Sequence, residues 1–331
     1  MKQIKLLFLL ASASVTGAFA QSNGLTDMSQ SRYAKMANTG IDAIHWTNGF
    51  WGERFNVFSG TSLQSMWNTW NTPEVSHGFR NFEIAAGICK GEHWGPPFHD
   101  GDMYKWMEGV ASVYAVNKDP ELDKLMDNFI ACVVKAQRAD GYIHTPVIIE
   151  ELNKGIDSHT QADSQQQTVI GTKVGSEDEK GAFANRLNFE TYNLGHLMMA
   201  GIVHHRATGK TTLLDAAVKA TDFLCHFYET ASAELARNAI CPSHYMGVVE
   251  MYRATGNPRY LLELSKNLID IRGMVESGTD DNQDRIPFRD QYRAMGHAVR
   301  ANYLYAGVAD VYAETGEQQL MKNLTSIWND I

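Results

Sequence analysis

The sequence contains few cysteines, and none is closely spaced with another. Four occur in 331 residues, at Cys89, Cys132, Cys225 and Cys241. An exported protein can form disulfides, but Cys132 and Cys225 fall inside predicted helices, where a buried thiol behaves as a small hydrophobic group. We therefore expect buried free thiols rather than a disulfide framework.

Positive charge is also scarce. The chain has 29 lysines and arginines against 38 aspartates and glutamates, which gives a formal net charge of −9 with neutral histidines. An acidic surface repels anionic lipid and the phosphate backbone of nucleic acids. The charge balance therefore predicts no nucleic-acid partner and favours a neutral ligand.

Long apolar runs are missing after the first 20 residues. Lys2 and Lys5 precede an apolar run at 6–15, and Ala18-Phe19-Ala20 fits the small-x-small pattern that signal peptidase recognises. We therefore predict a signal peptide at 1–20 and export to the periplasm or the medium. No later run approaches the roughly 18 apolar residues that a membrane span requires, so no span is expected.

The rest of the chain has the composition of a globular protein, with 44% hydrophobic residues and no disordered bias. We divide it into a polar lead-in at 21–40 and a helical domain at 41–331.

Helical hairpins dominate this domain. The stretch 189–210 reads as a helix that ends at Gly209, because glycine adopts the left-handed conformation found at helix C-termini. A second helix starts near Leu213. The apolar positions of the first helix follow the helical period and predict one buried stripe: Leu194, Leu197, Met198, Gly201, Ile202 and His205.

The same unit recurs along the chain. His244 and His297 each head an apolar helix that ends in Thr-Gly and is followed by a second amphipathic helix, and a more divergent copy starts at Asp102. The stop glycines Gly209, Gly256 and Gly316 recur at a spacing typical of helical repeats. We therefore predict an all-α fold with four helical hairpins.

A few short strands are expected beside the hairpins. One is predicted in 41–55, before an aromatic-rich turn, and another in the alternating apolar stretch that ends at Leu152, within the 142–190 insertion. The polar stretch 153–181 is long enough for a functional loop and could fold over the mouth of a pocket.

If successive hairpins curve into a ring, the first helix of each forms an inner wall, and the N-termini of these helices face one end. The residues at the helix heads are Asp102, His196, His244 and His297, with Glu190 just upstream of one head. Histidine, carboxylate and aromatic groups together suit a carbohydrate ligand. The alternative that each histidine only caps its helix stays open.

Six motifs, in this order, resemble the N-terminal part of the catalytic domain of glycoside hydrolase family 127. The resemblance covers nearly all of 41–331, and the motifs are HWTNGFWGERF, FHDGDMYKWMEG, QRADGYIHT, FETYNLGH with its ATGK turn, HYMGVVEMYRATGNPRY and GHAVRANYLYAG. It implies an (α/α)6 toroid that carries a retaining exo-glycosidase, with β-L-arabinofuranosidase as the known activity.

The family also implies roles for particular residues. Its inner-helix histidines hold the sugar hydroxyls, a role that transfers to His196, His244 and His297. Its aromatic-acid segment corresponds to Phe98 and Asp102. In the family, a cysteine thiolate beside a zinc ion is the nucleophile, other cysteines and a glutamate hold the zinc, and a second glutamate is the acid and base.

This sequence departs from the family pattern in what it lacks. The family's catalytic glutamate, Glu-Thr-Cys segment and paired cysteines come after the helix that contains Ile331, and the context of Cys241 matches neither cysteine motif. We therefore expect no catalytic residue and no metal site in this chain, and zinc only in the complete enzyme. We also expect the chain to be a fragment with an incomplete toroid.

Two other functions remain open. The chain could be a helical-repeat carbohydrate-binding protein without catalysis. It could also belong to another toroid family of glycosidases or lyases that use carboxylates only, since two suitably spaced carboxyl groups suffice for hydrolysis. In that case Glu190, Asp102 and Glu250 are the acids to test.

Overall fold

The computed structural model describes residues 24–155, 182–183, 185–232, 244–271 and 278–331. Its regular elements are all helical, and these ranges contain no β-strand. In chain order the elements are α1 (Gly49–Val57), the π-helical turn η1 (Phe58–Ser62), α2 (Leu63–Trp70), α3 (Gly78–Ala85), α4 (His99–Asn117), α5 (Pro120–Ala136), α6 (Thr145–Asn153), η2 (Arg186–Asn188), α7 (Glu190–Thr208), α8 (Thr212–Thr230), α10 (His244–Thr255), the π-helical turn η3 (Tyr260–Ser265), α11 (Lys266–Asp270), η4 (Phe288–Asp290), α12 (Ala298–Thr315) and α13 (Gln318–Asp330).

The expected short strands are therefore not found in the part of the chain that the structure describes. The stretch that ends at Leu152 forms α6, because Pro146 stands in the first helical turn, where its fixed φ favours a helix. Near the N-terminus, 41–48 form turns and irregular structure, and the aromatic-rich segment from Gly49 is helical. Most of the expected 153–181 loop lies outside the described residues.

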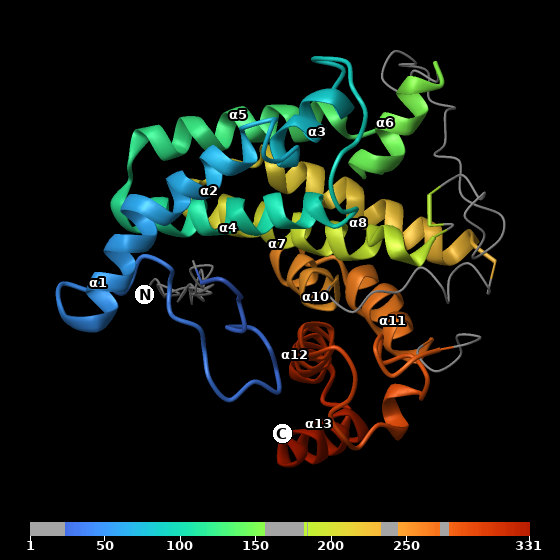
Figure 1. Cartoon of the computed structure of the whole chain (residues 1–331). Coiled ribbons are helices and arrows are strands. Elements are labelled where there is room, and N and C mark those ends of the chain that lie inside the picture. Colours follow the sequence, from blue (N-terminus) through green and yellow to red (C-terminus); the bar gives the residue numbers. More distant parts are fainter. Residues whose placement is uncertain (1–23, 156–181, 184, 233–243, 272–277) are drawn as a thin grey trace, which may run out of the picture.

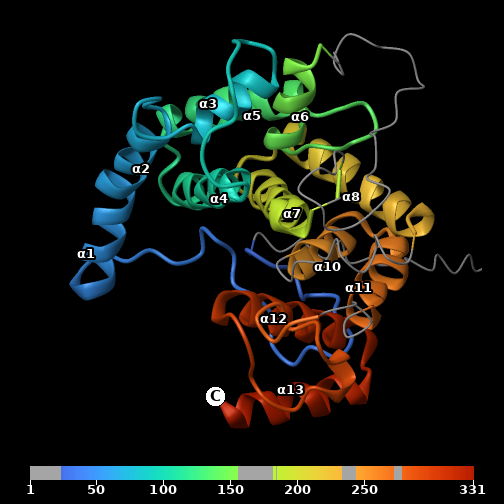
Figure 2. The same cartoon turned by 45° about the vertical axis from the view of Figure 1, so that its right-hand side comes forward.

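The four predicted hairpins are confirmed as α4/α5, α7/α8, α10 with η3–α11, and α12/α13. The first helices pack in succession, α4 on α7, α7 on α10, and α10 on α12, while α5 packs on α8 and α8 on η3 in a second layer. Figures 1 and 2 show that the row curves from α1 and α2 at one end to α13 at the other. The described hairpins form an open arc, and closure into a six-hairpin ring stays a prediction.

The sequence did not predict the helices at the α1 end of the arc. α1, η1 and α2 run antiparallel to α4, because Trp70 lies beside His99, with ring centroids 5.6 Å apart, and Phe58 lies against Gly109. α3 then packs on α5 and α6. This end of the arc therefore also has two layers of helices.

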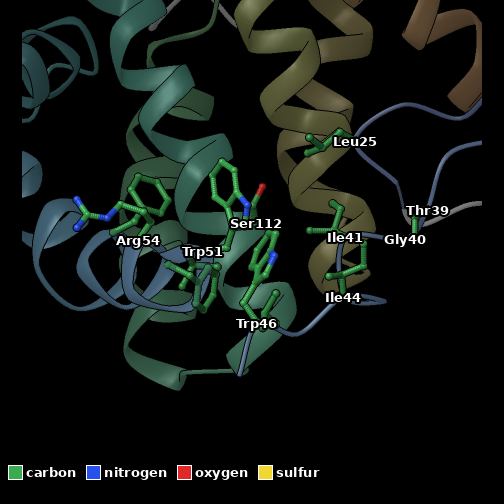
Figure 3. Close-up of a pocket in the computed structure, with 13 residues that line it drawn as sticks. Leu25, Thr39, Gly40, Ile41, Ile44, Trp46, Trp51, Arg54 and Ser112 are labelled. Atoms are coloured by element: carbon green, nitrogen blue, oxygen red, sulfur yellow. The ribbon is translucent and has the colours of Figure 1, made fainter. Parts of the chain in front are cut away.

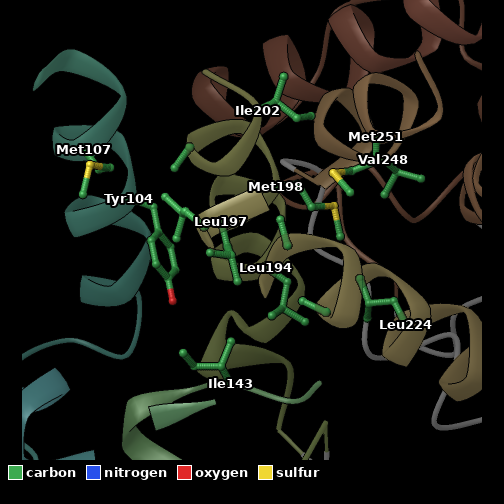
Figure 4. Close-up of a cluster of buried hydrophobic side chains, with 14 of the residues drawn as sticks. Tyr104, Met107, Ile143, Leu194, Leu197, Met198, Ile202, Leu224, Val248 and Met251 are labelled. Atoms are coloured by element: carbon green, nitrogen blue, oxygen red, sulfur yellow. The ribbon is translucent and has the colours of Figure 1, made fainter. Parts of the chain in front are cut away.

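Helix α7 lies at the centre of the core. It is buried on all sides rather than along one stripe, because it contacts α4, α8 and α10. Figure 4 shows its apolar side chains between α4 and α10, where the contributing residues include Tyr104, Met107, Leu194, Leu197, Met198, Ile202, Val248 and Met251. α7 thus fixes the relative position of three hairpins.

Glycine allows α10 to approach α7 closely. A Cβ atom at Gly247 would lie 2.6 Å from the carbonyl oxygen of Gly195 and 3.1 Å from Cβ of Met198. We expect Gly247→Ala to lower the free energy of unfolding by about 1–3 kcal/mol, as overpacking does, measured by urea denaturation. Gly60→Ala is the control, because no atom outside its chain neighbours and its own helical backbone lies within 4 Å of its added Cβ. Equal stabilities of the two variants would contradict this packing.

The N-terminal segment 24–33 crosses the C-terminal halves of α7, α10 and α12, which are the first helices of their hairpins. Arg206 of α7 donates to the carbonyl oxygen of Gly24 at 3.1 Å, and the backbone N–H of Asp27 donates to Glu250 of α10 at 2.8 Å. The N–H of Tyr33 donates to the carbonyl oxygen of Ala313 in α12 at 3.0 Å. The segment therefore joins three hairpins.

A buried ion-pair network underlies this segment. Glu250 is fully buried and pairs with Arg206 at 2.6 Å and Arg253 at 3.0 Å. Arg253 also pairs with Asp310 at 2.8 Å and Glu314 at 2.6 Å in α12. Each buried arginine therefore has a counter-charge from a neighbouring helix.

His204 is a buried histidine near the C-terminal end of α7. Neither of its ring nitrogens has a hydrogen-bond partner among the described residues. Burial, followed by the nearby Lys210, lowers the pKa of His204 from 6.5 to about 4. The imidazole is therefore neutral in the folded protein at pH 7.

This lowered pKa predicts loss of stability in acid. Between pH 6.5 and 4 the unfolded chain binds a proton at His204 that the folded chain does not, so stability falls as the pH falls, by up to ~1.4 kcal/mol per pH unit. Urea denaturation across this range should show a shallower pH dependence for His204→Leu. The exposed His226 on α8 supplies the control, His226→Leu, and equal slopes for both variants would refute the prediction.

Candidate functional site

The heads of α4 and α7 meet at a group of aromatic rings. Phe98 precedes α4, and its ring is edge-on to that of Phe189, with centroids 5.6 Å apart. Phe189 stands at the N-cap of α7 with φ +57°, a left-handed conformation that is unfavourable for a bulky residue. Backbone strain of this kind concentrates at functional sites.

An ion pair lies one turn further along α4. The Asp102 carboxylate accepts from the Lys105 ammonium at 2.8 Å, and the ammonium also donates to the Tyr192 hydroxyl of α7 at 2.6 Å. Burial opposes the charge, but the hydrogen bonds to Asp102 and Tyr192 prevail and raise the pKa of Lys105. Lys105 therefore stays protonated.

His196 lies between two tyrosine rings. Its ring centroid is 4.6 Å from that of Tyr192 and 5.4 Å from that of Tyr303 on α12. The side chain is buried, and its Nε2 atom has no hydrogen-bond partner among the described residues. A buried polar atom left unpaired costs about 1–3 kcal/mol, so a ligand hydroxyl that reached Nε2 would relieve this cost.

The protonation state of His196 suits such a ligand. Burial, followed by the charge of Lys105, lowers its pKa to about 3. The imidazole is neutral at pH 7, so one ring nitrogen donates and the other accepts. A neutral histidine can thus donate a hydrogen bond to a hydroxyl group or accept one from it.

Glu108 adds a second unusual group on α4. Burial raises its pKa to about 8, despite the opposing charge of Lys105, and Oε1 has no hydrogen-bond partner in the described ranges. At neutral pH the side chain is mainly the protonated acid. It can therefore donate as well as accept a hydrogen bond.

Glu190 is near this group in sequence, but its carboxylate is engaged elsewhere. It accepts from the Tyr142 hydroxyl at 2.5 Å and from the backbone N–H of Phe183 at 2.8 Å. Burial raises its pKa. Both oxygens thus tie the head of α7 to neighbouring segments, and the predicted sugar contact of Glu190 stays a prediction.

The other two predicted histidines stand at helix starts. His297 is the N-cap residue of α12, is exposed, and makes no side-chain capping hydrogen bond. His244 begins α10, but its side chain lies outside the described residues. His196 is inside α7 and does not cap it, so the capping explanation fails for His196 and His297.

A cluster of histidines supports the head of α4. Asp100 is buried and accepts from the backbone N–H and the hydroxyl of Thr145 at 2.7 and 2.6 Å, with Nδ1 of His144 3.6 Å away. Burial lowers the pKa of His93 to about 4, although the charge of Asp100 opposes the shift. The contacts of Asp100 fix α4 against the start of α6.

The described side chains do not fit a metal site. No group of three or more histidine, cysteine, aspartate or glutamate residues in this part of the chain is placed to hold a metal ion. Cys89 and Cys132 are free thiols, of which Cys132 is buried as predicted and Cys89 is half-buried, and Cys241 lies outside the described residues. No helix described by the structure is long and apolar enough to cross a membrane.

Two pockets lie on opposite parts of α4. One of about 280 Å³ is lined by Asp102 and Lys105 of α4 and by Trp70 of α2. The other, of about 470 Å³, lies at the far end of α4 and is mainly apolar (Figure 3); its walls include Trp46, Trp51 and Ser112. The pocket of the predicted Asp102 therefore contains a charged pair beside an aromatic ring.

The structure thus brings Phe98, Asp102 and His196 into one region at the heads of α4 and α7. Lys105, Tyr192 and Tyr303, which connect them, were not predicted from the sequence. Helical spacing was the available signal for two of these, because Lys105 follows Asp102 by three positions and Tyr192 precedes His196 by four. Tyr303 comes from a different hairpin and had no local signal.

Comparisons with known proteins identify the family of this chain. A sequence model of the β-L-arabinofuranosidase GH127 catalytic domain matches residues 43–331. The chain is 31% identical, over 277 residues, to a non-reducing end β-L-arabinofuranosidase of Bifidobacterium longum subsp. longum; the match covers 77% of this chain and 39% of that protein.

Solved structures are similar as well. A glycoside hydrolase with 77% identity matches with a TM-score of 0.69 over 94% of this chain and 40% of that chain. A GH127 β-L-arabinofuranosidase from Geobacillus stearothermophilus T6, at 28% identity, gives a TM-score of 0.69 over 86% of this chain and 44% of that chain. A GH127 β-arabinofuranosidase, also at 28% identity, gives a TM-score of 0.70 over 88% of this chain and 43% of that chain.

This chain spans less than half of the length of each of these relatives. Because the family model matches nearly the whole chain, from the aromatic-rich segment onward, the chain belongs to glycoside hydrolase family 127.

Proposed function

We propose that this chain is the sugar-binding part of an exported glycoside hydrolase that acts on L-arabinofuranosyl or related linkages. The names of the relatives support the substrate class. The predicted signal peptide at 1–20, which lies outside the described residues, supports export. The ligand is a carbohydrate rather than a nucleic acid, given the acidic composition.

His196 is the observation that carries this proposal. A neutral imidazole with an unpaired buried nitrogen lies between two tyrosine rings, and one of these tyrosines, Tyr192, accepts a hydrogen bond from the lysine of the Lys105–Asp102 pair. Sugars offer hydroxyl groups for the polar atoms and C–H faces for the rings. His244 and His297, at the heads of α10 and α12, are proposed to complete the set of hydroxyl-binding groups.

The chemical step is proposed to use residues outside this chain. In the complete protein, a cysteine nucleophile, a glutamate acid and base, and a zinc ion would give hydrolysis with retention of configuration. The side chains described here do not form a metal site. Their proposed task is to bind and orient the sugar.

The carboxylate-only alternative has less support from the geometry. Glu190 is bonded to Tyr142 and Phe183, whereas Glu250 is held between Arg206 and Arg253 at the opposite end of the inner helices. These two acids do not face a common pocket. Asp102 alone, paired with Lys105, does not provide the two carboxyl groups that this mechanism needs.

Hydrolysis of 4-nitrophenyl β-L-arabinofuranoside by the complete protein tests the proposal. We expect release of L-arabinose, with the β configuration in the first-formed product by proton NMR, and loss of activity after zinc chelation. Sugar binding without turnover would instead favour the non-catalytic binding protein. The absence of both sugar binding and turnover would contradict the proposal.

A further inference from the structure

Lys105 joins the α4 and α7 walls of the candidate site. Its ammonium group lies 2.8 Å from Asp102 Oδ1 and 2.6 Å from the Tyr192 hydroxyl. The ammonium also lies 5.2 Å from the centroid of the Tyr192 ring. Lysine has only donors, so the Tyr192 oxygen accepts this hydrogen bond.

The position of Tyr192 is fixed from a second side as well. A Cβ atom at Gly101 would lie 2.6 Å from Cε1 of Tyr192 and 2.8 Å from Oδ1 of Asn193. The backbone N–H of Gly101 donates to that Asn193 oxygen at 2.8 Å. The start of α4 therefore supports the tyrosine ring, while Lys105 holds its hydroxyl group.

His196 depends on Tyr192 for its orientation. The two rings are nearly perpendicular, with an interplanar angle of 75°, and Tyr303 lies at 72° to the imidazole. The buried imidazole has no hydrogen bond at Nε2 within the described structure. Packing against the two tyrosine rings is thus a main restraint on the direction of Nε2.

We propose that Lys105 is a positioning residue: anchored by Asp102, it fixes the Tyr192 hydroxyl so that the tyrosine ring holds His196 with Nε2 directed at a sugar hydroxyl. This role rests on the proposed function for its ligand, but the Lys105–Tyr192–His196 coupling exists without any ligand. Asp102 then acts through Lys105.

Several charged and titratable groups among the described residues surround this coupling. His99 of α4 interacts with the charge of Asp102, and Arg300 of α12 lies 5.5 Å from the centroid of the Phe189 ring, which contacts Tyr192. α4 supplies Asp102, Lys105 and Glu108, α7 supplies Tyr192 and His196, and α12 supplies Tyr303, whose pKa is raised by burial. Lys105 is the cation that acts on His196. A neutral residue at position 105 would therefore change the surroundings of the imidazole directly.

The test compares Lys105→Met, Lys105→Arg and the control Lys135→Met in the full chain at pH 7. Lys135 is exposed on α5, far along the sequence from the site. The first readout is the Cε1–H proton NMR signal of His196, identified by its absence in His196→Gln. The second is the affinity for L-arabinose by calorimetry, and melting temperatures report the stability of each variant.

We expect Lys105→Met to shift the His196 signal and to weaken L-arabinose binding about tenfold, the effect of losing an ordered charged hydrogen bond. Lys105→Arg, which keeps a cationic donor, should restore most of the shift. An unchanged His196 signal in Lys105→Met overturns the proposal, even if the melting temperature falls. If the wild-type chain binds no L-arabinose, the proposed ligand fails, while the NMR signal still decides the coupling.

Discussion

Replacement of Glu250 by alanine is expected to lower the free energy of unfolding by about 3–5 kcal/mol, because removal of this carboxylate leaves the buried Arg206 without its counter-charge. Glu250 accepts from Arg206, Arg253 and the backbone N–H of Asp27. The variant would lose the carboxylate that joins α7, α10 and the N-terminal segment, while Arg206 keeps its hydrogen bonds to the carbonyl oxygens of Gly24 and Leu25. Urea denaturation at pH 7 measures the effect.

Glu150→Ala is the matched control for this prediction. Glu150 is also a helical glutamate, but it is exposed on α6, where its partner is Lys154. Exposed pairs of this kind contribute little, so we expect a change within about 0.5 kcal/mol. A similar loss in both variants would show that the buried network does not stabilise the arc specifically.

Replacement of His196 by alanine is expected to lower kcat/KM of the complete protein by about a hundredfold on an arabinofuranoside substrate, because a site built to hydrogen-bond a hydroxyl loses its partner there. The proposed contact is made by Nε2, which has no other hydrogen-bond partner among the described residues. Steady-state kinetics with 4-nitrophenyl β-L-arabinofuranoside measures the change.

His226→Ala is the control for His196→Ala. His226 is exposed on α8, in the outer layer of helices. We expect its kcat/KM to equal that of the unchanged protein. If His196→Ala retained full activity while folded, the tyrosine-flanked imidazole would not bind the substrate, and the site would have to be sought elsewhere.

The hairpins could be predicted because their signals are local. Gly209, Gly256 and Gly316 all have positive φ values, between +70° and +77°, where glycine is favoured over other residues. Apolar periodicity between these glycines then placed the paired helices. The resemblance to the family rested on the same segments, and the comparisons confirmed it.

Other features depend on contacts between distant segments. The strand expected before Leu152 is α6, since a short apolar run does not distinguish strand from helix by its period. Glu190 was expected to face the ligand, but its partners Tyr142 and Phe183 lie outside the helix it begins. Sequence spacing alone does not reveal such pairings.

Only part of the site could be predicted, because its other residues also depend on contacts between distant segments. Asp102 and His196 were identified because the sequence predicted them at helix heads, although His196 lies inside α7; Lys105, Tyr192 and Tyr303 become recognisable only when α4, α7 and α12 are packed together. The Arg206–Glu250–Arg253 network likewise joins two hairpins and was not predicted.

A crystal structure of the complete protein with L-arabinose tests the central claim most directly. We expect the sugar near the heads of α4 and α7, with a hydroxyl oxygen within about 2.7–3.2 Å of Nε2 of His196 and a ring face against Tyr192 or Tyr303. A sugar bound elsewhere, with Nε2 of His196 still unpaired, would contradict it.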